Sequence, residues 1–261
     1  RSSLPDEATR ESTSAVRSEQ PSYDPSLTEF RVMKLSHQTI ELKPTHPFVI
    51  ARGGYAHHRN VIVRLADDDG LEGFGEAAPN RYYGESVATV VAALGQFKPI
   101  VERADPMALE STEAHLNRVL RGNASAKSAV SSALHDLVGK RLGLPVYRLW
   151  GLDASAVPQS SLTIAIAEND ELASRVAEAR EYPILKIKLG TDRDMEIVRI
   201  VRNAAPEKRL RVDANAAWTA KHAVRMSEFL AEQGVEMIEQ PVPANDIEGL
   251  RFVRKRSKLP V

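Results

Sequence analysis

Four charged side chains lie in or directly after short apolar runs at even spacing: Lys186, Lys188, Asp213 and Glu239. Lys188 and Asp213 are 25 residues apart, and Asp213 and Glu239 are 26 residues apart. A strand, a loop and a helix of three or four turns together need about 25 residues, so one such unit fits in each interval. A parallel barrel carries its active site at the carboxyl ends of its strands, which is where these charges are predicted to lie.

The two lysines have the spacing of neighbours on one face of a strand. Because alternate strand residues share a face, Lys186 and Lys188 are predicted to point one way and Leu185, Ile187 and Leu189 the other. Two ammonium groups near a cation would each favour the neutral form of the other, which lowers the lysine pKa toward that of a useful base. The alternative interpretation is that both lysines cap the strand and extend into solvent.

Asp213 and Glu239 end neighbouring strands, so their carboxylates are predicted to converge on one hard cation. Mg²⁺ suits such a site because it takes oxygen ligands, often one or two carboxylates together with substrate and water. Either acid alone would be better explained as a helix N-cap or a surface ion-pair partner. Asn215 is predicted either to orient Asp213 or to cap the next helix.

Three further positions are weaker candidates for contact with a ligand. Thr163 ends an apolar run one unit earlier and could bind a substrate, although threonine also favours strands for its shape alone. Arg52 lies in the Gly-rich loop 51–55 and could pair with a substrate carboxylate, or simply be solvated. His57 and His58 give a weak metal signal, because neighbours in an extended segment face opposite sides.

From residue 158 onward the pattern alternates between strand and helix. We expect strands over 160–167, 184–189, 209–213 and 235–239, helices over 170–181, 192–205, 219–233 and 246–256, and the start of a fifth strand over 258–261. Such units give a parallel sheet or barrel through right-handed crossovers. Because a closed barrel has eight units, residues 151–261 are expected to form the first half of a modified (β/α) TIM-type barrel, an α/β fold whose C-terminal part is missing from this chain.

The preceding residues 28–150 have the pattern of an α+β domain. We expect antiparallel strands over 28–43, 59–66 and 71–76, a turn over 67–70, and helices over 85–101, from Asp105–Pro106 onward, and over 125–141, the last ended by Gly143. Segments 51–55 and 78–84 are predicted to be loops that reach over a ligand. Residues 1–27 are rich in Ser, Glu, Arg and Pro, and are predicted to form a disordered leader.

Composition removes several classes of function. The 261 residues include 35 Lys+Arg and 35 Asp+Glu, and this balance argues against nucleic acid or an anionic membrane as the partner. The chain has no cysteine, which excludes disulfides and thiolate metal sites, and no apolar run approaches the roughly 20 residues of a membrane span. We expect a cytoplasmic protein, because the many acidic residues of the leader argue against a transit peptide. The sequence does not begin with Met, so organelle targeting by a trimmed leader stays open.

The combined motifs resemble the enolase superfamily. The matching pieces are 185–188, which has the Lys-x-Lys pattern, 212–215, 238–241, and upstream 73–77 and 144–151, which resemble the capping domain and its junction with the barrel. Within the superfamily the chain resembles the muconate lactonizing enzyme subgroup, and especially dipeptide epimerases of the L-Ala-D/L-Glu type, through 79–85 and 163–166.

This resemblance implies a Mg²⁺-dependent isomerase that abstracts the proton α to a carboxylate, forms an ene-diolate and epimerises a dipeptide. It implies that Lys188 is an acid/base catalyst, that Lys186 assists it and binds the substrate carboxylate, and that Thr163 contacts substrate. It also implies that Asp213 and Glu239 bind the metal.

Other features of the family are not found in the sequence. The resemblance further implies a third acidic metal ligand, a partner lysine and aspartates for the dipeptide amino group. All of these are expected after Val261, the third ligand about 25 residues after Glu239. Ala216 and Ala217 stand where the family pattern leads us to expect glycines.

Two other functions stay open. A cycloisomerase of the muconate or o-succinylbenzoate type, or an acid-sugar dehydratase, would use the same ene-diolate. A non-catalytic barrel fragment is the third possibility, because half a barrel has open sheet edges that invite association. We expect a homo-oligomer that binds a small carboxylate substrate.

Overall fold

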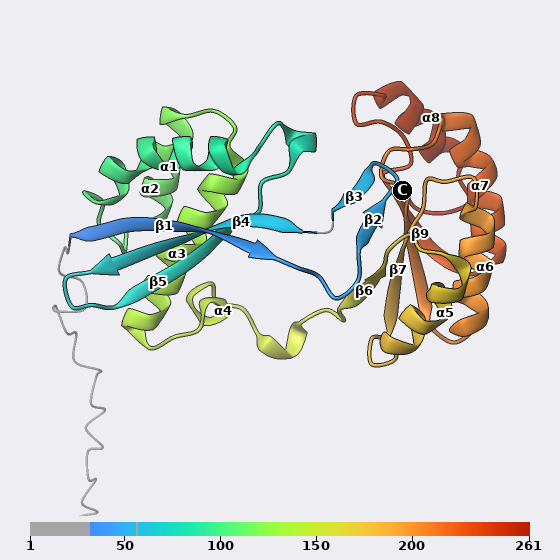
Figure 1. Cartoon of the computed structure of the whole chain (residues 1–261), viewed down its shortest axis with the longest axis horizontal. Coiled ribbons are helices and arrows are strands. Elements are labelled where there is room, and N and C mark those ends of the chain that lie inside the picture. Colours follow the sequence, from blue (N-terminus) through green and yellow to red (C-terminus); the bar gives the residue numbers. More distant parts are fainter. Residues whose placement is uncertain (1–31, 56) are drawn as a thin grey trace, which may run out of the picture.

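A computed structural model describes residues 32–55 and 57–261, which form two lobes (Figure 1). The predicted leader, 1–27, lies outside these residues. In the first lobe β1 (Met33–Leu42), β4 (His58–Asp67) and β5 (Glu72–Ala77) form an antiparallel sheet in the order β1-β4-β5. The predicted strands are confirmed over the described residues.

Helices α1 (Val87–Val101) and α3 (Ala124–Leu142) pack against this sheet, and α2 (Leu109–Val119) packs against these two helices. The short α4 (Val146–Leu149) follows. The close approach of α3 to β5 requires Gly73 and Gly75, where a Cβ would overlap backbone atoms of α3. The prediction that Asp105–Pro106 starts the second helix is wrong. The Asp105 carboxylate accepts a hydrogen bond from the backbone N–H of Met107 at 2.9 Å, which forms a turn, and the helix begins at Leu109.

A β-hairpin connects the two lobes. Its strands β2 (Phe48–Ile50) and β3 (Gly53–Tyr55) pair antiparallel, so the prediction of a loop over all of 51–55 is wrong for 53–55. The carbonyl of Val49 accepts a hydrogen bond from the backbone N–H of Ile166 at 3.1 Å, which links the hairpin to the second lobe. The other predicted loop, 78–84, contains only the short 3₁₀ turn Arg81–Tyr83.

The second lobe is a parallel sheet in the order β6-β7-β8-β9. Its elements alternate as predicted: β6 (Ser161–Ile164), α5 (Asn169–Glu178), β7 (Ile184–Lys188), α6 (Asp194–Ala204), β8 (Arg209–Asp213), α7 (Ala220–Glu232), β9 (Val235–Glu239) and α8 (Ile247–Arg256). The predicted strand start over 258–261 is not formed, although the Pro260 carbonyl accepts a hydrogen bond from Ile238 N at 3.0 Å.

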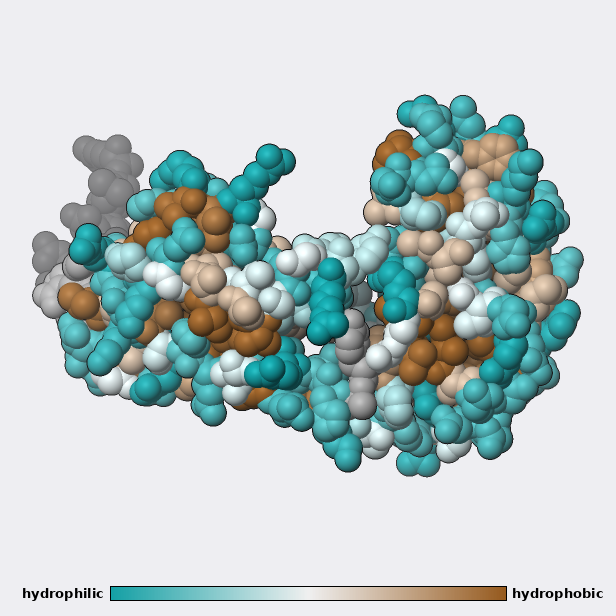
Figure 2. Space-filling view, turned by 45° about the horizontal axis from the view of Figure 1, so that its top comes forward, coloured by the Kyte–Doolittle hydropathy of each residue, from teal (hydrophilic) through white to brown (hydrophobic). Residues whose placement is uncertain are grey.

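Each lobe has its own apolar core. In the second lobe Leu185, Ile187 and Val212 are fully buried beneath the surrounding helices, together with apolar residues of α5, α6 and α7. Figure 2 shows the two lobes joined by a narrower region near the hairpin. The predicted domain boundary near residue 150 stays a prediction. Among the described residues, no helix is both long and apolar enough to span a bilayer.

Candidate active site

The register of the parallel sheet places the candidate residues in two adjacent levels, each of which is a row of paired residues that runs across the strands. Thr163 pairs with Lys186 across β6 and β7, and one level further on Lys188 pairs with Asp213, which pairs in turn with Glu239. Paired positions of a parallel sheet point to the same face. The predicted meeting of the two lysines and two acids at the carboxyl ends of three strands is therefore present.

The Asp213 carboxylate is the centre of this group. Its Oδ2 lies 2.7 Å from Lys188 Nζ and 3.2 Å from Lys186 Nζ, and Lys186 Nζ lies 2.6 Å from Glu239 Oε2. Asp213 is 1% exposed and Lys188 is 8% exposed, whereas Glu239 is open to solvent. The site thus runs from a buried ion pair to an accessible carboxylate, with the Lys186 ammonium between the two acids.

Ion pairing shifts the pKa of both Asp213 and Lys186. Burial alone would raise the pKa of Asp213, but hydrogen bonds from Lys188, the Asn215 backbone and Lys186 outweigh it and hold the pKa below its ordinary value. Burial alone would lower the pKa of Lys186, but Glu239 and Asp213 outweigh it and raise the pKa. The pKa of Lys186 is raised among the protein groups because two carboxylates face it, and the expected lowering near a cation stays a prediction.

Asn215 acts on Asp213 through its backbone. The Asn215 N–H donates to Asp213 Oδ1 at 2.8 Å. The alternative that Asn215 caps the next helix is wrong, because Thr219 caps α7 by accepting from the His222 N–H at 3.3 Å. The side-chain Oδ1 of Asn215 is buried and has no hydrogen-bond partner. Asn215 and Ala216 both adopt left-handed backbone conformations, with φ of 47° and 67°.

Two segments of the first lobe reach these strand ends. Arg52 Nη1 donates to the Asn215 carbonyl at 2.5 Å, and its guanidinium carbon lies 4.1 Å from the centre of the Tyr82 ring. Gln240 Nε2, directly after β9, lies 3.5 Å from the Tyr82 hydroxyl. The sequence predicted that both loops reach over a ligand, but gave no sign that Tyr82 packs on Arg52, because a contact between residues 30 positions apart leaves no periodic pattern.

The donor set fits a magnesium ion. Asp213 and Glu239 already share one cation, the Lys186 ammonium, and Asn215, two residues after Asp213, has a buried side-chain oxygen without a hydrogen-bond partner. In residues 32–55 and 57–261 no cluster of three or more His, Cys, Asp or Glu side chains could hold a metal. Two carboxylates completed by water and substrate are nevertheless an ordinary Mg²⁺ environment. His57, a weak metal candidate in the sequence, instead pairs with Glu41, with 2.8 Å between His57 Nδ1 and Glu41 Oε1.

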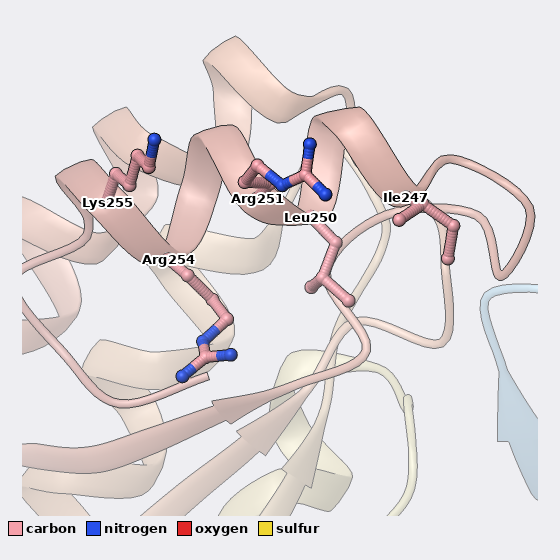
Figure 3. A pocket seen from close by; sticks show the side chains of 5 residues that line it. All are labelled: Ile247, Leu250, Arg251, Arg254 and Lys255. Carbon is pink, nitrogen blue, oxygen red and sulfur yellow. The ribbon is translucent and has the colours of Figure 1, made fainter.

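A shallow cavity of about 420 Å³ lies elsewhere, on helix α8. It is lined by Ile247, Leu250, Arg251, Arg254 and Lys255 (Figure 3). Figure 3 shows Leu250 and Arg254 projecting from the same side of the helix. None of the predicted site residues lines it, so the candidate chemistry belongs to the strand ends.

Comparison with known proteins places this arrangement in a family. Residues 35–151 match the mandelate racemase / muconate lactonizing enzyme N-terminal domain, and residues 168–261 match the enolase C-terminal domain-like family. The chain is 36% identical over 236 residues to an L-Ala-D/L-amino acid epimerase of Pedosphaera parvula, covering 88% of this chain and 67% of that protein. The chain belongs to the enolase superfamily.

Other superfamily members agree with this assignment. The L-Ala-D/L-Glu epimerase of Bacteroides thetaiotaomicron is 36% identical over 231 residues, which are 88% of this chain and 60% of that protein. A dipeptide epimerase of Enterococcus faecalis, solved with Mg and the dipeptide L-Leu-L-Tyr, has a TM-score of 0.82 at 29% identity, over 88% of this chain and 66% of that one. The muconate lactonizing enzyme of Pseudomonas fluorescens, solved with muconolactone, has a TM-score of 0.82 at 28% identity, over 88% of this chain and 66% of that one.

These relatives confirm the predicted fold class, an α/β fold with an N-terminal capping domain and a C-terminal barrel-like domain. The chain spans 60% of the length of the Bacteroides thetaiotaomicron epimerase and 67% of the length of the Pedosphaera parvula epimerase.

Proposed function

We propose that this chain carries part of the active site of a magnesium-dependent isomerase that epimerises a dipeptide by removing the proton α to a carboxylate. The observation that carries the proposal is the chain of ion pairs that links Lys188 to Asp213, Asp213 to Lys186 and Lys186 to Glu239. Similarity to curated dipeptide epimerases supports the substrate class.

Lys188 is the proposed acid/base catalyst because it is buried at the strand end and faces the same side as the acids. Its neutral amine takes the proton from the α-carbon, and the C–H bonding pair moves into the carboxylate to give an ene-diolate. An acid on the opposite face then returns a proton and inverts the centre. The resemblance to the superfamily implies that this second acid is a lysine.

Lys186 is proposed to assist by binding the substrate carboxylate. As an ammonium it would stabilise the negative charge developing on the ene-diolate. Thr163 lies at the same level as Lys186 and Arg52 reaches the loop after β8, which supports the proposal that both contact substrate. Arg52 would then use donors that the Asn215 carbonyl does not occupy.

Asp213 and Glu239 are the proposed ligands of Mg²⁺, with Asn215 behind them. A bound ion would supply positive charge at the substrate carboxylate and so stabilise the ene-diolate. Asp213→Asn and Glu239→Gln are each expected to weaken Mg²⁺ binding in calorimetric titration. Asp246→Asn, which changes an acid in a loop outside the site, should not.

Incubation of the full-length protein with dipeptides and Mg²⁺, followed by chiral separation of the products, tests the reaction directly. L-Ala-L-Glu should yield L-Ala-D-Glu. If no dipeptide is converted, the epimerase proposal fails.

The runner-up is cycloisomerisation. The structural similarity to muconate lactonizing enzyme supports it as strongly as the similarity to the Enterococcus enzyme supports epimerisation. An acid-sugar dehydratase would also share the ene-diolate. Turnover of muconate or a sugar acid without turnover of any dipeptide would decide for one of these. The homo-oligomer and the cytoplasmic location stay predictions.

A further inference from the structure

Asp194, the first residue of α6, is a buried carboxylate outside the group described above. It is 3% exposed, and no ion pair with it is found in the described part of the chain. A buried carboxylate is costly unless hydrogen bonds replace its hydration. The hydrogen bonds that stabilise it therefore show what this residue holds together.

Every donor to Asp194 comes from a loop that follows a site strand. Its Oδ1 accepts from Gly190 N at 2.8 Å, Thr191 N at 2.8 Å and Thr191 Oγ1 at 3.0 Å, and its Oδ2 accepts from Gly190 N at 3.0 Å and Trp218 Nε1 at 2.8 Å. Gly190 lies two residues after Lys188, whereas Trp218 lies in the loop after Asp213.

Backbone hydrogen bonds extend this connection to the third strand. Trp218 N donates to the Pro241 carbonyl at 2.9 Å, just after Glu239. Leu189 N donates to the Asp213 carbonyl at 2.9 Å, and Ala214 N donates to the Glu239 carbonyl at 3.2 Å. A continuous set of bonds thus joins the loops behind Lys188, Asp213 and Glu239.

Helix capping alone explains only part of this arrangement. The bonds from Gly190 and Thr191 are local, and a carboxylate at the start of a helix is favourable for stability by itself. The bond from Trp218 is different because it crosses to the next strand–helix unit, and the indole is itself 4% exposed.

We propose that Asp194 and Trp218 are positioning residues that fix the level of Lys188 relative to Asp213 and Glu239. This inference rests on the proposed function for its effect on turnover, but the geometric part can be measured without any reaction. Residues behind a metal site that orient its ligands typically change affinity or activity about 10- to 100-fold when altered.

The test compares Asp194→Asn, Trp218→Phe and the double variant, with Asp246→Asn as the matched control. Asp246 also accepts a backbone hydrogen bond at the start of a helix, from Gly249 N at 2.8 Å, but it does not contact Asp194 or Trp218. Trp218→Phe keeps an aromatic ring and removes only the indole donor. Amide hydrogen exchange by NMR and steady-state kinetics are measured on each full chain with Mg²⁺ present.

Positioning predicts a local change in exchange. Leu189 and Ala214 should exchange about tenfold or more faster in both single variants, while amides inside the strands, such as Ile187 and Val212, keep their wild-type rates. The turnover number kcat should fall about 10- to 100-fold with KM within about threefold, and the double variant should lose no more than the larger single loss. The control variant should match wild type in its amide exchange rates, in kcat and in KM.

Equal acceleration at all of these amides would show a purely structural role and overturn the proposal, as would unchanged exchange at Leu189 and Ala214. Kinetic losses that multiply in the double variant would also overturn it. If the wild-type protein converts no dipeptide, the proposed function fails, while the exchange pattern still decides whether Asp194 and Trp218 position the strand ends.

Discussion

Lys188 and Asp213 occupy paired register positions on neighbouring parallel strands, with the ammonium nitrogen 2.7 Å from a carboxylate oxygen. The carboxylate is nearly inaccessible, and Lys186 contacts the same oxygen from the adjacent level. A buried charge is costly when it is unpaired, so the two side chains should be strongly coupled in their contributions to the free energy of unfolding.

A double-mutant cycle measures that coupling. Lys188→Met should lower the free energy of unfolding by about 2 kcal/mol, less than for a fully unpaired charge because Lys186 and the Asn215 N–H still contact Asp213. Combined with Asp213→Asn, the cycle should give a coupling energy of about 1–3 kcal/mol in urea unfolding. The half-exposed pair Lys140–Asp136 is the control and should couple by less than about 1 kcal/mol. Equal coupling in both cycles would contradict the assigned burial.

The lowered pKa of Asp213 predicts a loss of stability in acid. The folded pKa lies below the ordinary value of 3.8, so the unfolded chain takes up this proton first as the pH falls. The stabilisation is fully present above the ordinary value and disappears as the pH falls through the folded value. The stability difference between wild type and Asp213→Asn should therefore shrink between about pH 6 and about pH 2 in urea titrations. A difference that stays constant or grows over this range would contradict the ion pair.

Gly190 is required where the hairpin meets the sheet. Its φ is 111°, and a Cβ there would lie 2.5 Å from Ala51 Cβ and 2.7 Å from Ala217 Cβ. Gly190→Ala should cost about 3 kcal/mol or more, because backbone strain and overlap add. Gly70→Ala, at φ of 78° with open space around it, isolates the strain and should cost about 1 kcal/mol. Thermal unfolding of both variants separates the cost of backbone strain from the cost of steric overlap. Equal losses of stability in the two variants would show that the hairpin does not pack against Gly190.

Ala216 carries a side chain in the left-handed region, at φ of 67°. Ala216→Gly should raise the free energy of unfolding by about 0.5–1 kcal/mol, because relief of strain outweighs the greater freedom of the unfolded chain. Ala217→Gly, at a position outside that region, should instead lower it by a similar amount. If both variants are destabilised, the turn after β8 does not have this conformation.

The second lobe was the most predictable part of the fold. Parallel strands buried on both faces give mostly apolar runs such as 184–189, and the even spacing of the charges defined the repeat. The hairpin strand Gly53–Tyr55 was missed because glycines disfavour strands, and only pairing with Phe48–Ile50 makes it one. The start of α2 was missed because a turn at Asp105 looks like a cap in sequence.

The site was predictable in its residues but not in its contacts. Strand periodicity placed Lys186 and Lys188 on one face, whereas the raised pKa of Lys186 depends on Glu239, 53 residues away. Asp194 likewise looks like an ordinary acid in the first turn of a helix until Trp218 is brought to it by the adjacent loop. Such long-range contacts leave no local signal.

The central claim is that Lys188 removes the proton α to a substrate carboxylate, and solvent exchange at that carbon tests it most directly. L-Ala-L-Glu is incubated in D₂O with Mg²⁺ and the protein, and the α-proton signal of the glutamate residue is followed by NMR. The signal should disappear with wild type and with Lys34→Ala, an exposed lysine on β1, and should persist with Lys188→Ala, whose rate falls at least about 100-fold. Exchange that continues at the wild-type rate in Lys188→Ala, or no exchange in wild type, would contradict the account.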